Sequence, residues 1–462
     1  MNVLSWLAAG AAGWFWVQAL LPRVTAPAWI RHTLAASVAL IFGTGATASL
    51  FFALLWAGAS PTAAAWTSDA LILASGAAVW LLRRRRATES APANPARPVP
   101  LAWLGAVAAA VCTLAFFAGV YVVLTASPQG DWDAWAVWNV RARFLAHEGL
   151  WRNAVSPELA FSHPESPLLW SAAVARAWSE SGAIAQAAPQ AGSLLASLAL
   201  LLLFASAIAV RAGWQWAALA ASALLMTTSL WRSAPGQLAD VPLAAMMLAS
   251  VVSALLSQQA VWSAPALALS GALASMAAFT KNEGLAFLVF LAIPIATVAR
   301  LRALWWFAGA GPVLMLSLAF RFLLAPDAQM VSGESFRQLS RLWTALQGMG
   351  TEFWKLGDFP AHPLLFIALL FFVFRPTRPW RPLWPVLPPA LLLVADIVFL
   401  WGSPEDQANL LRSAGDRLWL QAMPMLLLCA FLWLAQAEPE STKQQPPPEE
   451  RRKTKPASVA KR

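Results

Sequence analysis

Three aspartates stand at the margins of apolar segments, where a carboxylate is costly unless it has a task. Asp131 and Asp133 directly follow one apolar run in GDWDAWAVWN, and Asp240 opens another in QLADVPLA. A carboxylate in such a place can act as a general base towards a hydroxyl group. The structural alternative is that each aspartate only caps the helix that follows it, with Pro242 in the first turn after Asp240.

Cations and a histidine stand near the same kind of boundary. Lys281 and Glu283 belong to the charged turn TKNEG between two apolar segments, and His163 begins the proline turn HPESP. Arg412 and Arg417 stand beside the last apolar segment, and an arginine fork suits phosphate recognition. A tight turn or a helix entry would explain each residue alone. Together they favour a site for a polar, phosphate-bearing, lipid-linked substrate.

The residues after Asp133 predict an amphipathic helix over 133–147, because apolar and polar side chains recur at helical spacing on two different faces. The apolar stripe consists of Trp135, Trp138, Ala142 and Leu145, and the polar stripe of Asn139, Arg143 and His147. We expect this helix to lie on the outer membrane surface, with its apolar stripe in lipid. A second amphipathic helix is expected in the later external loop, 326–360.

Composition indicates the surroundings of these residues. The 462 residues are 59% hydrophobic and 12% charged, whereas soluble domains carry about 25% charged residues. A soluble globular domain is therefore excluded, and the fold class is an all-α polytopic membrane protein. The two cysteines, Cys112 and Cys429, lie in apolar runs, which argues against a zinc site or disulfide framework. The net charge of +10 is spread between apolar segments, so it indicates topology rather than nucleic-acid binding.

A membrane helix needs about 20 apolar residues, and the chain offers thirteen candidates. They are 3–22, 33–58, 65–82, 101–125, 186–210, 213–231, 238–258, 262–279, 284–299, 303–325, 361–374, 383–401 and 417–436. The segments 284–299 and 361–374 are short, which leaves a buried or re-entrant piece open at either place. The first segment lacks a basic region before it, which favours a retained anchor over a signal peptide.

Basic loops predict the orientation, because cytoplasmic loops are enriched in Lys and Arg. Six basic clusters fall on one face if the N-terminus is outside and the C-terminus is cytoplasmic. They are Arg23 and Arg31; Arg83 to Arg86; Arg211; Arg300 and Arg302; Arg375, Arg378 and Arg381; and Arg451, Arg452, Lys453, Lys455, Lys461 and Arg462 of the tail. The loops 126–185, 232–240, 326–360 and 402–416 then lie outside, with the candidate residues.

The chain divides at its charged and proline-rich stretches. Residues 1–83 hold three leading transmembrane helices, and the basic, proline-rich stretch 84–100 reads as a cytoplasmic linker. The transmembrane module with the candidate residues is 101–436. The tail 437–462 is rich in Pro, Gln, Glu and Lys, which predicts a disordered cytoplasmic extension.

The set of candidate site residues resembles that of the polytopic GT-C glycosyltransferases, specifically the bacterial relatives of protein O-mannosyltransferases and aminoarabinose transferases. The resemblance covers about residues 101–436. It is carried by Asp131-Trp132-Asp133, His163-Pro164 with Pro167-Leu168, Asp240, the turn 281–284 and Arg417. Asp-Trp-Asp stands where protein mannosyltransferases have Asp-Glu, and HPESPLL replaces a compact His-Pro-Pro-Leu. No large soluble domain follows the helices, which weakens the hypothesis that the acceptor is a protein.

The resemblance implies a transferase on the external or periplasmic face of a bacterial inner membrane. It would move a sugar from a polyprenyl-phosphate donor to an acceptor hydroxyl on a lipid, glycan or protein. Asp133 or Asp131 would be the general base, with Asp133 favoured by its place at the helix start, and Asp240 would be a second carboxylate that orients the acceptor. The supporting residues would be Arg417, Arg412 and Lys281 for the donor phosphate, and His163 and Glu283 for loop positioning.

The same residues bear on cofactors and on alternative functions. No cofactor is firmly implied, and a divalent cation is compatible with the resemblance. The alternative function is a transporter or flippase for a lipid-linked or anionic substrate. Transporters usually hold their charges near the bilayer midplane and show internal repeats, whereas here the charges gather at one mouth. A non-catalytic scaffold would explain the helices but not the clustered aspartates.

Overall fold

The computed structural model describes residues 2–83, 96, 98–327, 330–357, 362–376 and 383–436. The tail 437–462 and most of the expected linker lie outside the described residues. The described part of the chain is helical, with loops and one isolated β-bridge between Ala96 and Gln436. The prediction of an all-α membrane protein with several long apolar helices is confirmed.

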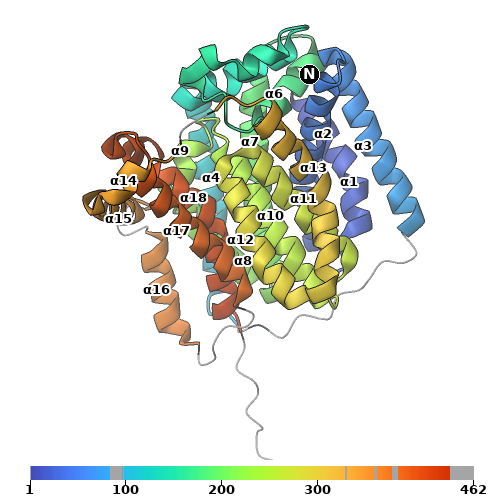
Figure 1. Ribbon diagram of the computed structural model, residues 1–462. Helices are drawn as coiled ribbons and strands as arrows, with labels where there is room; N and C mark the ends of the chain where they lie inside the picture. The colour runs from blue at the N-terminus through green and yellow to red at the C-terminus, as the bar shows by residue number, and fades with distance from the viewer. Residues whose placement is uncertain are drawn as a thin grey trace, which may run out of the picture.

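The apolar runs form helices because a backbone surrounded by lipid must satisfy its hydrogen bonds within the segment. Each of the thirteen predicted segments coincides with a helix (Figure 1). These helices are α1 (Asn2–Leu20), α2 (Ala28–Trp56), α3 (Pro61–Arg83), α4 (Ala102–Ala126), α7 (Ala187–Ala212), α8 (Trp214–Leu225), α10 (Asp240–Gln259), α11 (Ala264–Thr280), α12 (Asn282–Ala299), α13 (Ala303–Leu323), α16 (Pro363–Phe374), α17 (Leu387–Gly402) and α18 (Gln407–Leu434).

Not all of these thirteen helices are long enough to cross a membrane. Within the described residues, nine helical stretches are long and apolar enough to cross a membrane, and one of them, Asn282–Leu323, holds both α12 and α13. The apolar helices α11 and α16 are shorter, and α8 has 12 residues. The count of thirteen crossings therefore stays a prediction.

Shorter helices lie towards the end of the bundle that holds the N-terminus: those between α4 and α7 are at the top of Figure 1, and those between α13 and α16 lie lower, at its left. They are η1 (Ala134–Asn139), α5 (Val140–Ala146), η2 (Trp151–Val155), η3 (Pro157–Ser162), α6 (Leu169–Ser181), α9 (Thr228–Ser233), α14 (Gly333–Arg337) and α15 (Leu339–Trp354). Hydrogen bonds tie their loops together: Gln237 donates to the Pro128 carbonyl at 3.0 Å, and the Thr228 amide donates to the Leu356 carbonyl at 2.8 Å. We call this the site end.

The opposite end holds short connections, among them η4 (Arg300–Arg302) and η5 (Trp384–Val386). The Trp384 indole donates to the side chain of Gln258 at 3.2 Å, and the Val99 amide donates to the side chain of Gln215 at 3.1 Å. The segment after α16 therefore meets the end of α10, and the start of α8 meets the segment before α4. The described loops that were predicted to be cytoplasmic and those predicted to be external lie at opposite ends of the molecule (Figure 1).

The helix predicted over 133–147 forms, but its surroundings differ from the prediction. It opens with the π-helical turn η1 and continues as α5. Three residues of the apolar stripe are buried within the protein rather than facing lipid: Trp138, Ala142 and Leu145. Asn139 of the polar stripe is buried as well. The cause is that α6 and the segment before it pack over the helix, which a local periodicity does not reveal.

The second predicted amphipathic helix is α15, and it has a buried and an exposed side. Ala345 and Met349 are buried against the bundle, whereas Trp343, Gln347 and Thr351 follow one another at four-residue steps on the exposed side. The prediction of an amphipathic helix within 326–360 is therefore confirmed.

A buried ionic contact joins the leading helices to α6. The Arg176 guanidinium, which is inaccessible to solvent, lies 2.8 Å from Asp69 and 2.5 Å from Glu180. The same guanidinium donates to the carbonyl of Ser5 at 2.9 Å. Since Ser5 lies in α1 and Asp69 in α3, two of the leading helices meet α6 at a single side chain.

We expect the two ends of the bundle to react with a membrane-impermeant thiol reagent from opposite sides of the membrane. The background is a chain with Cys112→Ala and Cys429→Ala, which removes the two native thiols. Into it are placed Phe161→Cys at the site end or Leu301→Cys at the opposite end, since both side chains are exposed. In sealed vesicles of one orientation, one cysteine should be labelled directly and the other only after detergent. Direct labelling of both would contradict this arrangement.

Candidate functional site

A tight turn after α4 brings the first two aspartates to the start of α10. Gly130 has φ +77°, a conformation that favours glycine, and a Cβ there would lie 2.7 Å from the Gly236 carbonyl oxygen. The Asp131 amide donates to that same carbonyl at 3.0 Å. The residues around Asp131 are therefore held against the loop that leads into α10.

A second tight connection places Lys281. This single residue separates α11 from α12 and has an extended backbone. A Cβ at Gly284 would collide with the carbonyl oxygen of Ala277 in the last turn of α11. The glycine thus allows α12 to start against α11, which directs the turn towards α10.

Asp240 is the centre of a buried ionic network. Its side chain is 1% exposed, and its Oδ1 accepts from Lys281 Nζ at 2.9 Å and from Gln421 Nε2 at 2.8 Å. Its Oδ2 lies 3.7 Å from Arg417 Nε. A buried carboxylate is strongly destabilising unless it is paired and hydrogen-bonded, so α10, the α11–α12 turn and α18 must meet here.

The network continues on both sides of Asp240. Arg417 contacts Asp133 Oδ2 through its Nη1 at 2.5 Å, and Lys281 contacts Glu283 at 2.9 Å. Burial alone would lower the pKa of Lys281, but the neighbouring carboxylates Asp240 and Glu283 outweigh burial and raise it. Lys281 is therefore charged. Five residues predicted for the site thus form one connected group, which we call the Asp240 network.

Asp131 belongs to a neighbouring group. Its Oδ2 lies 3.5 Å from Arg232, and Arg232 lies 3.5 Å from Asp416, the residue next to Arg417. The other oxygen of Asp131 accepts from the amide of Trp132 at 2.9 Å. Asp131 and Arg232 are largely open to solvent, so this pairing is weaker than the one at Asp133.

The capping alternative does not describe Asp133 or Asp240. Asp133 precedes η1, yet no capping hydrogen bond from its side chain occurs among the described residues. Asp240 is the first residue of α10 rather than the residue before it, and its carboxylate binds side chains of other helices. Asp131 contacts Arg232 and also accepts from the amide of Trp132, the first residue of this helical stretch. The carboxylates of Asp133 and Asp240 are therefore directed to cations, whereas that of Asp131 contacts both a cation and a helix end.

Arg412 is separate from the network, although it was grouped with Arg417 in the prediction. Helix α18 begins ten residues earlier than predicted, because the Asp406 side chain caps it by accepting from the amide of Ala408. Both arginines therefore lie within the helix. Five residues of an α-helix turn by roughly 140°, so the two side chains leave different faces, and Arg412 is exposed.

His163 lies beside the network without a direct bond to it within the described residues. Its Nδ1 is 3.3 Å from Glu165. The hydrogen bond to Glu165 raises the pKa of His163, burial opposes this, and the charges of Glu405 and Asp133 add to the rise. His163 is therefore within electrostatic range of Asp133.

Several residues of the site were not predicted. Gln421 follows Arg417 by four residues, so helical spacing alone places it on the same face. Asp396 interrupts the apolar segment LLLVADIVFL, and an acid inside such a segment is by itself a signal of function. It is 4% exposed, and its Oδ2 has no hydrogen-bond partner among the described residues. Arg232 and Asp416 carried no distinguishing sequence signal.

The site has more carboxylates than cations. The two neighbouring groups contain five carboxylates, Asp131, Asp133, Asp240, Glu283 and Asp416, and three cations, Arg232, Lys281 and Arg417. Buried polar atoms of Asp416, Arg417 and Gln421 make no hydrogen bond within the described part of the chain. Such atoms are rare in folded proteins and indicate room for water or a ligand. In that part, no three His, Cys, Asp or Glu side chains converge as metal ligands.

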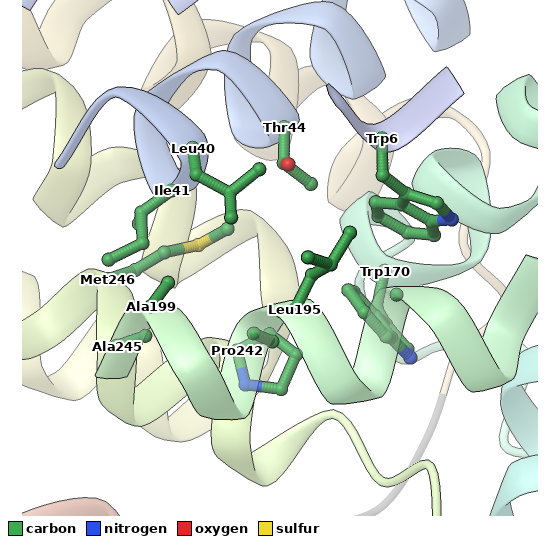
Figure 2. Close-up of a pocket in the computed structure, with 12 residues that line it drawn as sticks. Trp6, Leu40, Ile41, Thr44, Trp170, Leu195, Ala199, Pro242, Ala245 and Met246 are labelled. Carbon is green, nitrogen blue, oxygen red and sulfur yellow. The ribbon is translucent and has the colours of Figure 1, made fainter. Parts of the chain in front are cut away.

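A small apolar pocket lies deeper in the bundle, between α1, α2, α6, α7 and α10 (Figure 2). Trp6 and Trp170 line one part, and Pro242 and Met246 contribute from α10. These two α10 residues lie roughly 200–240° around the helix from Asp240. The pocket is therefore on the opposite face of α10 and is separate from the Asp240 network.

Comparison with known proteins adds no assignment: no family model, curated protein or solved structure matches the chain. The chemistry must be argued from the geometry. Carboxylates of different exposure beside two largely buried cations can transfer a proton, bind an anion, or do both in turn.

We expect Asp240 and Lys281 to depend on each other for stability. Asp240→Asn or Lys281→Met alone should lower the free energy of unfolding by up to about 3–5 kcal/mol, because each removes the nearest ion-pair partner of the other residue. Among the described residues, Lys281 then keeps only Glu283 as an ion-pair partner, and Asp240 only the longer contact with Arg417. The double variant should lose less than the sum of the two single losses. Thermal unfolding in detergent measures all three, with Arg412→Gln as an exposed control. Additive losses would show that the pair is not coupled.

Proposed function

We propose that the chain is a membrane glycosyltransferase that moves a sugar from a polyprenyl-phosphate donor to an acceptor hydroxyl. The observation that supports this most is the Asp240 network, which draws Asp133, Asp240, Lys281, Glu283 and Arg417 from four separate parts of the chain. The resemblance to GT-C enzymes supplies the reaction class. The network supplies its requirements: a carboxylate that acceptors can reach and cations for a departing phosphate.

The proposed location is the external or periplasmic face of a bacterial inner membrane. The described loops that were predicted to be cytoplasmic lie at the end opposite the site, and by the positive-inside rule we propose that this end is cytoplasmic. Arg211, Arg300 and Arg302 are examples. The donor lipid would then reach the site from the outer leaflet, and the C-terminus would be cytoplasmic.

Exposure separates the roles of the carboxylates. Asp133 is 31% exposed, whereas Asp240 is 1% exposed. We therefore assign Asp133 as the general base and Asp240 as the carboxylate that holds Lys281 and Arg417 in place. In the proposed inverting step, the acceptor oxygen attacks the anomeric carbon while its proton passes to Asp133. The bond from that carbon to the lipid phosphate oxygen breaks, and the phosphate leaves with the electron pair.

The excess of carboxylates determines how the donor would bind. Arg417 is already paired with Asp133, so an arriving phosphate cannot add to an unoccupied cation. We propose that the donor phosphate takes the place of Asp133 on Arg417. This exchange frees the carboxylate of Asp133 at the moment when the donor is in place. Lys281 lies next along the network and adds charge near the departing phosphate, while Arg412 takes no part.

A transporter or flippase is the second candidate, and one observation favours it. Asp396 is a buried carboxylate inside an apolar segment, a feature common in substrate and proton pathways. Vesicle assays separate the two functions. Sugar transfer without transmembrane movement of substrate supports the transferase, and movement without transfer supports the transporter.

Replacing Asp133 should abolish most of the transfer. We expect Asp133→Asn to lower kcat by about 10²–10⁴, the usual contribution of a general base, and Asp131→Asn to have a much smaller effect. The measurement is sugar transfer from a polyprenyl-phosphate donor by the purified protein in vesicles, with the exposed Asp327→Asn as control. Full activity in both test variants would refute a first-loop base, and loss only in Asp131→Asn would move the role to Asp131.

The two arginines of α18 should differ in their effect on catalysis. Arg417→Gln should lower kcat/KM for the donor by roughly 10²-fold, the scale of losing a donor to a developing anion. Arg412→Gln is the matched control from the same helix and should leave the value unchanged. Donor titrations of both variants make the comparison. Equal losses would mean that the Asp240 network does not bind the phosphate.

A further inference from the structure

Arg141 is a buried cation that the proposed reaction does not use. It lies in α5, eight residues after Asp133, and is inaccessible to solvent. Its guanidinium donates to the carbonyl oxygens of Ala154 at 3.0 Å, Pro164 at 3.2 Å and Ser166 at 2.6 Å. The remaining bond, to the His163 carbonyl, is 3.4 Å. Within the described residues, four backbone carbonyls and no carboxylate bind this side chain.

Such an arrangement needs a reason, because a buried guanidinium without an ion pair is costly. Burial lowers the pKa of Arg141 to about 9, and the nearby charge of Glu165 offsets part of this. Arg141 therefore stays charged at neutral pH. Its fork can hold several carbonyls at fixed angles, so its effect is to fasten the segment 154–166 onto α5.

The fastened segment carries His163 in a strained conformation. His163 has φ 49°, a left-handed backbone that a side chain other than glycine adopts only when its surroundings enforce it. The bond from Arg141 to its carbonyl is part of that enforcement. The side chain is then paired with Glu165 and remains 56% exposed.

Two further bonds connect the same region to the turn that follows Asp133. The hydroxyl of Ser162 donates to the Val137 carbonyl at 3.5 Å, and that of Ser171 donates to the Trp138 carbonyl at 2.9 Å. Both acceptors belong to the π-helical turn η1, a geometry that often marks functional sites. These two bonds therefore fix the segment 154–166 and the start of α6 to the turn that follows Asp133.

We infer that Arg141 is a positioning residue that fixes the His163–Glu165 pair at the side of the site where the acceptor approaches Asp133. The inference rests on the proposed function and deepens it. Asp133 faces Arg417, and hence the donor, on one side. His163 follows Ser162, whose hydroxyl bonds to the Val137 carbonyl four residues after Asp133, and within the described residues His163 pairs with Glu165 rather than with the Asp240 network. The pair it forms with Glu165 can hydrogen-bond a hydroxyl-bearing acceptor as that acceptor reaches the base.

Arg141→Met tests this inference, with Arg143→Met as the matched control, since Arg143 is exposed on the same helix. Hydrogen exchange of the 154–166 amides should accelerate by about tenfold or more in Arg141→Met and stay unchanged in the control. In transfer assays, KM for the acceptor should rise several-fold while KM for the donor is unchanged. A purely structural loss would raise both or lower only the active fraction.

Arg141→Lys keeps the positive charge but loses the planar guanidinium, so its KM for the acceptor should lie between that of the unaltered protein and that of Arg141→Met. It also provides the test if Arg141→Met does not fold. Glu165→Gln should raise the acceptor KM without loosening the segment. Unchanged exchange in the Arg141 variants would overturn the clamp, and faster exchange with unchanged kinetics would overturn its positioning role. If the unaltered protein transfers no sugar, the proposed function fails, and the exchange measurement still decides whether Arg141 holds the segment.

Discussion

A carboxylate removed from water at Asp240 requires several side chains to converge on it. Lys281 arrives on a turn of one residue, which Gly284 permits, and Gln421 and Arg417 arrive from successive turns of α18. The pairing therefore determines how α10, α11, α12 and α18 meet at the site end. Asp133 joins last, through the outer side of Arg417. It is the member of this group that combines a strong ion pair with access to solvent.

The two sides of the Arg417 guanidinium therefore have different roles. The Asp240 side is sealed and holds the guanidinium in place, whereas the Asp133 side is open and can be exchanged for another anion. In the proposed reaction, occupancy by the donor and release of the base are one event. An acceptor that arrives without a donor would find Asp133 still paired with Arg417, so the base would become available only once the donor is in place.

Sequence patterns predicted the features that depend on local composition. Every apolar run became a helix, and the spacing of charges placed Asp133, Asp240, Lys281, Glu283 and Arg417 at one end, where they do converge. The failures have a common cause. The stripe of 133–147 was expected in lipid because the folding of α6 over it is a distant event. The earlier start of α18 depends on a cap at Asp406. Arg141 escaped notice because its partners are backbone carbonyls, which leave no trace in residue types.

The contact at Arg176 bears on how such a chain can change over evolutionary time. Its two carboxylate partners and one carbonyl come from α1, α3 and α6. A shortened chain that lacked the first three helices would keep the arginine and Glu180 but lose Asp69 and Ser5. The leading helices are thus not a removable extension, and their loss would need a compensating substitution at position 176. The three leading helices and the buried charge of Arg176 would therefore be kept or lost together.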